Sequence, residues 1–290
     1  MKQIKELWKN KKVTFSCEVF PPKKESDMEP VTRAALEIAQ LKPDFMSVTY
    51  GAGGGTSQHT LQVAQQIQTQ CGVPALAHLT CVSSSREKVQ GMLQEMRARN
   101  LQNVLALRGD IPEGMDLAQA RDYHFASELV REIHEAGDFC VGAACYPDGH
   151  VEAPSRAVDL DYLKEKVDCG CDFLTSQMFF DNGVFYNFLY HVLDKGISVP
   201  VLAGVMPVTN GKQIARICRM SGTVLPTRFR TIVERYGDNP KAMRQAGVAY
   251  ATEQIIDLMA NGVRGIHLYT MNKPEIAREI MDNLSDLLEA

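Results

Sequence analysis

The strongest constraint on the fold is a regular alternation of two sequence textures along the chain. Short runs of β-branched, aromatic and small apolar residues are typical of buried parallel strands. Longer segments with apolar residues every three or four positions are typical of amphipathic helices. The strand-like runs are 13–20, 45–51, 74–81, 103–110, 140–147, 173–180, 201–208 and 265–272. The helical segments between and after them are 28–41, 60–70, 86–100, 126–137, 160–170, 185–196, 211–220 and 274–289.

Eight strand–helix units in one chain predict an α/β protein with a closed (β/α)8 barrel, the TIM-barrel architecture. The 290 residues suit such a barrel, which takes about 250 residues before insertions. Two intervals are longer than the rest: 111–124 follows the fourth run, and 221–262 carries two further helical segments, 227–237 and 242–262. Long segments after strands often build substrate sites. No stretch resembles a flexible linker, so we expect a single domain spanning 1–290.

A doubly wound open sheet is the alternative architecture, and it predicts a GxGxxG turn after an early strand. The loop 51–56 comes close, because it follows a strand-like run and precedes a helical segment. Position 56 is a threonine, however, and no acidic residue stands about 20 positions later. The barrel is therefore favoured, and the loop is interpreted as a tight turn with close backbone approach to another group.

Composition excludes several classes of function. The net charge of -4 provides no global field for nucleic acid or an anionic membrane surface. No apolar run approaches the roughly 20 residues of a membrane span, and residues 1–12 lack the apolar core of a secretory signal. The eight scattered cysteines predict reduced thiols in a cytoplasmic protein. Cys169-Gly170-Cys171 is the one tight pair, and no further ligands at zinc spacing accompany it, so we expect no metal.

Polar side chains cluster where the strand-like runs end. The carboxyl ends of barrel strands face the active-site mouth. Seven of the eight runs place polar residues there: Glu18, Thr49, Tyr50, His78, Thr80, Arg108, Asp110, Tyr146, Gln177, Tyr269 and Asn272. Each has a purely structural alternative, but together they predict a catalytic ring.

The alternatives for individual residues remain open at this point. Glu18 lies within an apolar run, so it is either paired or has a raised pKa, and the raised pKa would suit a general acid. His78 is by itself consistent with a core histidine, Gln177 with a core amide, and Arg108 could pair with Asp110 on one face of a strand. No Ser-His-Asp set, nucleophile elbow or metal cluster is visible. Chemistry with so few nucleophiles points to a cofactor.

Six motifs, in order along nearly the whole chain, carry a family resemblance. They are FSCEVFPP (15–22), SVTYGA (47–52), AHLTC (77–81), LALRGD (105–110), ACYP (144–147) and QMFFD (177–181). The set resembles the bacterial methylenetetrahydrofolate reductases. The resemblance implies a flavin-containing (β/α)8 barrel without the regulatory domain of eukaryotic members.

The resemblance also implies a reaction that contributes to one-carbon metabolism and methionine biosynthesis. NADH or NADPH would deliver hydride to FAD and leave, in a ping-pong sequence. 5,10-Methylenetetrahydrofolate would then bind over the flavin and be reduced to 5-methyltetrahydrofolate. Glu18 would protonate the folate to open its five-membered ring, which requires a neutral carboxyl group.

The family's functional positions map onto this sequence residue by residue. Asp110 would lie by the flavin and contact the pterin, where an anion disfavours flavin reduction and helps hold a cationic intermediate. Gln177 would touch both folate and nicotinamide, and Gln213 and Lys273 would contact the folate. The FAD contacts implied are Thr49, Tyr50, Ala52, His78, Arg108, Gly109, Asp110, Ala126, Tyr146, His150, Ala153, Asp159 and Lys166.

Several positions depart from the family pattern, including a glycine run at 53–55 that is richer than expected. Tyr162 and Glu165 stand where relatives carry an asparagine and a basic residue, and Ile217 replaces an aromatic lid residue of some members. We expect a homo-oligomer that binds only small molecules, while a cysteine-rich partner subunit, used by some members, is left open. The rival functions are another flavin-dependent barrel reductase and a non-catalytic folate- or flavin-binding barrel. Retention of Glu18 favours an enzyme over the latter.

Overall fold

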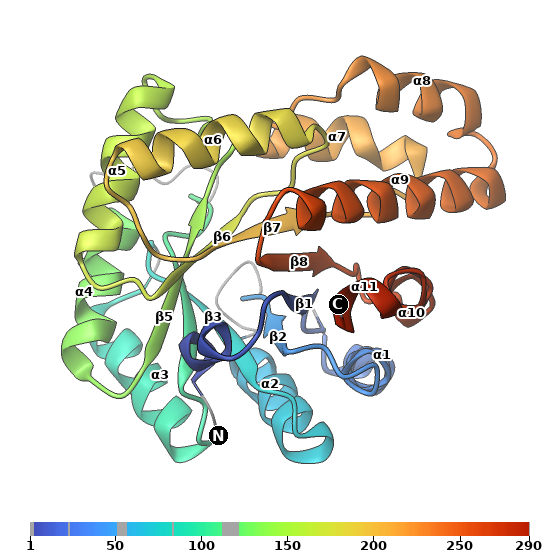
Figure 1. The fold of residues 1–290 in the computed structure, drawn as a ribbon. Helices are drawn as coiled ribbons and strands as arrows, with labels where there is room; N and C mark the ends of the chain where they lie inside the picture. The colour runs from blue at the N-terminus through green and yellow to red at the C-terminus, as the bar shows by residue number, and fades with distance from the viewer. Residues whose placement is uncertain (1–2, 23, 51–56, 83, 112–121, 290) are drawn as a thin grey trace.

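Eight parallel strands close into a barrel in the computed structural model, which describes residues 3–22, 24–50, 57–82, 84–111 and 122–289. Each strand pairs with the next in sequence, and β8 pairs with β1 (Figure 1). The strands are β1 (Thr14–Val19), β2 (Phe45–Val48), β3 (Ala75–Thr80), β4 (Asn103–Leu107), β5 (Cys140–Cys145), β6 (Phe173–Ser176), β7 (Val201–Val205) and β8 (Gly265–Tyr269). The predicted (β/α)8 barrel is thus confirmed.

Helices surround this barrel, and every predicted helical segment is confirmed. They are α1 (Met28–Ala39), α2 (Ser57–Cys71), α3 (Arg86–Ala98), α4 (Ala126–Ala136), α5 (Arg156–Asp168), α6 (Asn182–Asp194), α7 (Gly211–Ser221), α8 (Thr227–Tyr236), α9 (Pro240–Ala260), α10 (Pro274–Asn283) and α11 (Ser285–Glu289). The short 3-10 helices η1 (Ile4–Lys9) and η2 (Glu25–Asp27) precede β1 and α1. The loop 51–56 and most of the interval 111–124 lie outside the described residues.

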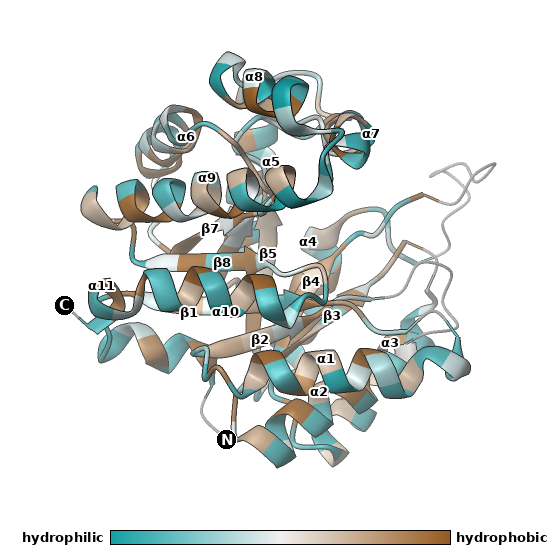
Figure 2. Cartoon of the chain, turned by 90° about the vertical axis from the view of Figure 1, so that its right-hand side faces the viewer, coloured by the Kyte–Doolittle hydropathy of each residue, from teal (hydrophilic) through white to brown (hydrophobic). Residues whose placement is uncertain are grey.

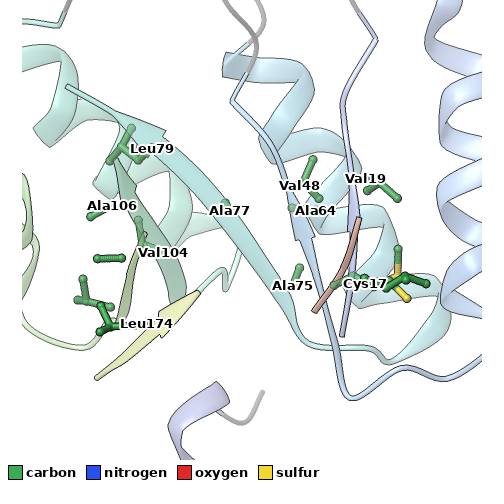
Figure 3. Packing of buried hydrophobic residues seen from close by; sticks show 14 of the residues in the cluster. Cys17, Val19, Val48, Ala64, Ala75, Ala77, Leu79, Val104, Ala106 and Leu174 are labelled. Carbon is green, nitrogen blue, oxygen red and sulfur yellow. The ribbon is translucent and has the colours of Figure 1, made fainter. Parts of the chain in front are cut away.

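Strand residues alternate between two environments because successive side chains point to opposite faces of a sheet. Cys17, Val48, Ala77 and Val104 belong to the large apolar cluster between strands and helices, part of which Figure 3 shows. The hydropathy colouring in Figure 2 shows brown strands inside helices of mixed character. Among the described helices, none is long and apolar enough to cross a membrane.

The amino-terminal end of the barrel is sealed by apolar side chains. An inward-facing cluster fills this floor and comprises Ile4, Phe45, Leu76, Leu105, Cys140, Phe173 and Leu202. Ile4 of η1 is fully buried, and its backbone N–H donates to Asn103 Oδ1 at 2.9 Å. Trp8 packs on Phe173 with ring centroids 5.3 Å apart. The interior is therefore a closed core at this end, and any site must open at the other.

Candidate active site

Two adjoining cavities lie at the carboxyl ends of the strands. The mouth cavity has a volume of about 580 Å³, and its wall includes Glu18, Thr49, Tyr50, His78, Asp110, Gln177 and Tyr269. The side cavity, about 410 Å³, reaches outward to α4 and α5, and its wall includes Arg108, Phe125, His150, Glu152, Tyr162 and Lys166. Leu107, Ala144 and Tyr146 line both. The two cavities therefore lie side by side, with these three residues at their common border.

Glu18 is held by partners from the two strands beside it. The parallel register sets it opposite Ser47 on β2 and Tyr269 on β8. Ser47 Oγ donates a hydrogen bond to Glu18 Oε2 at 3.1 Å, and His267 Nε2 lies 3.4 Å from the same oxygen. Behind it, His267 Nδ1 lies 2.8 Å from Ser16 Oγ. The carboxyl group is thus part of a polar network inside the barrel.

This network decides between the two alternatives for Glu18. Burial acts to raise the pKa of the carboxyl group, and it is the largest single influence. The hydrogen bond from His267, the positive charge that His78 and His267 can carry, and the hydrogen bond from Ser47 together outweigh it. The net pKa of Glu18 is therefore lowered. Glu18 is thus paired with polar neighbours, and the expectation of an apolar niche around it is wrong for this structure.

His78 faces the mouth cavity from β3 and is almost completely buried. Its Nε2 atom lies 3.4 Å from Glu18 Oε2, yet it makes no hydrogen bond to any described residue. Burial lowers the pKa of His78 to about 4, while the Glu18 carboxylate acts in the opposite direction. Thr175 Oγ1 on β6 is also buried in this wall, without a hydrogen-bond partner in the described structure. His78 is thus no satisfied core histidine, and both atoms remain available to a polar ligand.

Arg108 holds the main positive charge of the side cavity. Its guanidinium donates two hydrogen bonds to Glu152, Nη1 to Oε2 at 2.5 Å and Nη2 to Oε1 at 2.7 Å. The hydrogen bonds to Glu152 raise the pKa of Arg108 and lower that of the carboxylate. The alternative that Arg108 pairs with Asp110 is therefore wrong, because β4 ends at Leu107 and the chain turns at Gly109 with φ 89°.

Lys166 and His150 complete the polar wall of the side cavity. Lys166 Nζ donates to the Ala144 carbonyl at 2.6 Å, and burial lowers the pKa of this amine. The backbone N–H of His150 donates to Asp159 Oδ2 at 3.1 Å. The His150 ring packs edge-on against Tyr146 with centroids 4.6 Å apart. The side cavity thus presents two cations, Arg108 and Lys166, that could face phosphate groups. Three carboxylates, Glu152, Asp159 and Glu165, line the same cavity.

The structure brings most of the predicted site residues into these two cavities. The mouth cavity is lined by Glu18, Thr49, Tyr50, His78, Gly109, Asp110, Tyr146 and Gln177. The side cavity is lined by Arg108, Ala126, Tyr146, His150, Ala153, Asp159 and Lys166. Ala52 lies outside the described residues. Their contacts with folate and FAD remain predictions.

Three predicted or candidate residues lie apart from both cavity walls. Gln213 is exposed on α7, and Lys273 Nζ donates to Thr209 Oγ1 at 2.6 Å. Asn272 exchanges two hydrogen bonds of 2.9 Å with the backbone of Phe20. Asn272 thus ties the loop after β8 to the loop after β1, which is a structural role.

Sequence reasoning missed the polar network around Glu18. Ser16, Ser47 and His267 are buried polar residues inside strand-like runs, so their signal was a polar residue at an inward-facing position. Gly204 is a second signal, because a glycine inside a strand often marks the close approach of another group. A Cβ atom there would collide with the Ser176 carbonyl and the Tyr269 ring, whose hydroxyl donates to that carbonyl at 2.7 Å. In the described ranges, no group of three or more His, Cys, Asp or Glu side chains could hold a metal ion.

The family model described as methylenetetrahydrofolate reductase matches residues 3–285. A 5,10-methylenetetrahydrofolate reductase of Pectobacterium carotovorum is 32% identical over 274 residues, covering 94% of this chain and 90% of that protein. A methylenetetrahydrofolate reductase (NADH) of Arabidopsis thaliana is 35% identical over 295 residues, covering 97% of this chain. The chain spans about half the length of such plant relatives, 50% in that case.

Solved structures resemble the chain in fold. An uncharacterised protein from Clostridium thermocellum, described as binding two copies of 5-methyl-5,6,7,8-tetrahydrofolic acid, superposes with a TM-score of 0.66. Each chain is covered to 98%, at 13% sequence identity. At this identity the likeness supports the barrel architecture and nothing further.

Proposed function

Because this chain belongs to the methylenetetrahydrofolate reductase family, we propose that it reduces 5,10-methylenetetrahydrofolate to 5-methyltetrahydrofolate, using FAD and a nicotinamide donor. The observation that carries the proposal is that the two cavities adjoin each other at Tyr146. One holds a buried carboxylate with Asp110 and Gln177, and the other holds Arg108 and Lys166. A reaction centre would thereby lie next to a phosphate-binding site.

The residues present fit FAD. His78 Nε2 and Thr175 Oγ1 are buried polar atoms in the mouth cavity without a hydrogen-bond partner in the described structure, as expected for a wall that completes its bonding on a polar ring system. Arg108 and Lys166 would face the diphosphate. When bound, FAD would supply hydride transfer between nicotinamide and folate. The flavin ring would lie against Thr49, Tyr50 and Gly109, which line the same wall.

Glu18 would deliver the proton that opens the folate ring, and its network supports this role despite the lowered pKa. Ser16 Oγ donates to the Ile266 carbonyl at 3.0 Å, so His267 Nδ1 is left to donate to Ser16. Nδ1 then carries the one proton of the neutral imidazole. A proton between His267 Nε2 and Glu18 Oε2 would be a second proton, shared by the imidazole and the carboxylate. Covering Glu18 with a pterin would strengthen the effect of burial and favour its protonated form.

Asp110 and Gln177 would orient the pterin from the opposite part of the same wall. A carboxylate that accepts hydrogen bonds from the pterin would fix its orientation and stabilise a cationic folate during ring opening. Gln177 Oε1 accepts from the backbone N–H of Met178 at 2.9 Å, which leaves its amide N–H₂ group directed elsewhere for a ligand. Both the nicotinamide and the folate would use this place in turn.

The test uses the isolated protein. We expect a flavin absorbance spectrum, or uptake of added FAD, followed by anaerobic bleaching with NADH or NADPH and recovery of colour with 5,10-methylenetetrahydrofolate. NADH is the first donor to try, since the Arabidopsis relative carries it in its name. Bleaching without any other protein would also exclude an obligatory electron-donating subunit. A colourless protein that takes up no FAD would overturn the proposal.

A further inference from the structure

Two exposed aromatic rings face each other at the edge of the side cavity. Phe125 directly precedes α4 and Tyr162 lies on α5, and both line this cavity. Their ring centroids are 6.4 Å apart with the planes at 20°. Phe125 is 56% exposed and Tyr162 is 52% exposed. Aromatic side chains usually bury most of their surface, so a parallel pair left in solvent beside a cavity is a surface suited to another flat ring.

The local packing of the two helices does not depend on this pair. The apolar face of α4 is made by Leu129, Val130 and Ile133, and α5 buries Leu163. Phe125 contributes its backbone to the start of α4, where its N–H donates to Glu128 Oε2 at 2.9 Å. The two rings therefore add little to the core, and their placement is better explained by a ligand.

The pair borders the side cavity, away from the residues that this cavity shares with the mouth cavity. Tyr146 borders both cavities, whereas Phe125 and Tyr162 border the side cavity alone. Arg108 and Lys166 lie in the wall of that same cavity. A flat ring in the mouth, cations for phosphates, and a flat aromatic surface at the outer edge match a ligand with a ring system at each end and a diphosphate between them.

We propose that Phe125 and Tyr162 form an aromatic platform on which the adenine ring of FAD stacks, and that this platform makes the protein prefer FAD to FMN. The inference rests on the proposed function, since it assigns the far end of the same ligand. Tyr162 is one of the positions that depart from the family pattern, so the platform is a property of this chain. Stacking on an aromatic ring tolerates any base, because each base has a π-face.

The test compares FAD with FMN, which lacks the adenylate half. Flavin-free protein is titrated with each flavin, and binding is followed by flavin fluorescence. In Phe125→Ala and Tyr162→Ala, the Kd for FAD should rise roughly 5- to 100-fold while the Kd for FMN stays unchanged. Tyr162→Phe keeps the ring and should bind FAD as the wild type does. Tyr190→Ala on α6 is the matched control, because Tyr190 is 68% exposed and lines neither cavity.

The outcomes separate the platform from the proposed function. Wild-type protein that binds FAD, with both alanine variants within about twofold of it, would overturn the platform and leave the proposed function standing. Equal losses for FAD and FMN would also overturn it, because the rings would then only shape the cavity. Failure of the wild type to bind either flavin would overturn the proposed function itself. Thermal unfolding of the flavin-free variants verifies that they are folded.

Discussion

At the scale of single residues, the molecule shows how a strand register creates a chemical environment. Glu18 could be singled out from its position at the end of an apolar run. Ser47 and His267 stand out only as polar residues within apolar runs, and their contact with Glu18 depends on the parallel register of three strands. His267 is 249 residues away along the chain. The paired state of the carboxylate, and hence the direction of its pKa shift, therefore required the structure.

Glu18→Gln should separate the two halves of the proposed reaction. Glutamine has nearly the same shape and can keep the hydrogen bond from Ser47, but it cannot carry the proton. We expect FAD binding and flavin reduction by the nicotinamide donor to be unchanged, and folate reduction to fall at least about 100-fold. Anaerobic stopped-flow measurement of each half-reaction tests this. Glu25→Gln, at an exposed carboxylate paired with His59, is the control, and normal methyltetrahydrofolate formation by Glu18→Gln would refute the assigned role.

Glu152→Gln should strengthen FAD binding. The Glu152 carboxylate holds the Arg108 guanidinium through two hydrogen bonds and so competes with a phosphate for it. Since Glu152 is 47% exposed, solvent screening limits the gain to about 2- to 5-fold in Kd. The titration should be made at low and high salt, with Glu253→Gln, which breaks the Arg228 pair elsewhere, as the control. Weaker binding would instead mean that Glu152 orients Arg108 for the ligand.

At the scale of elements, apolar patterns predicted every strand and α-helix among the described residues, because barrel strands are buried on both faces and the surrounding helices on one. The ends of the strands were harder to predict. The run 173–180 yields a strand that stops at Ser176, and the run 103–110 one that stops at Leu107. In both cases the residues of the run that follow the strand line the cavities or pack in the apolar clusters against the helices. An apolar pattern predicts which residues are buried. Because burial continues past the last hydrogen bond of the strand ladder, the pattern does not predict where the strand ends.

Two glycines in helices should respond in opposite ways to alanine. At Gly247 in α9, a Cβ atom would collide with the backbone carbonyl of Val208, whereas at Gly91 in α3 it would meet open space. Gly247→Ala should lower the free energy of unfolding by about 1–3 kcal/mol or more. Gly91→Ala should raise it by about 0.5–1 kcal/mol, because alanine favours the helix.

Urea unfolding of the two glycine variants measures both effects. Since Val208 precedes Thr209, the partner of Lys273, Gly247→Ala should also disturb the loop after β7. Similar stabilities for the two variants would show that α9 can move away from this loop without cost.

At the scale of the whole molecule, the barrel buries a histidine in its uncharged form, which should make stability depend on pH. The pKa of His78 is lowered to about 4 in the folded protein, whereas an unfolded histidine titrates near 6.5. Between these values the unfolded chain binds more protons than the folded chain. The contribution of His78 to the free energy of unfolding is therefore fully present above about pH 6.5 and is lost as the pH falls toward 4. The expected loss is on the order of 3 kcal/mol.

Urea unfolding at pH 7 and pH 5 measures this dependence. His78→Gln should flatten the pH dependence over this window, since glutamine does not titrate. His124→Gln, at a histidine with a 43% exposed side chain, controls for loss of an imidazole elsewhere. An unchanged pH dependence in His78→Gln would show that another group controls the acid sensitivity.

Closure of the barrel also fixes the order in which the candidate active site can be completed. Glu18 is on the first strand, while His267 and Tyr269 arrive on the last, and the two ends meet only when β1 pairs with β8. An incomplete ring would leave a lone carboxylate in an open groove. Pairing of the first and last strands brings His267 to Glu18 and so completes the side-chain contacts that act on the pKa of this carboxyl group. Acid–base competence at this residue would thus report that folding has finished.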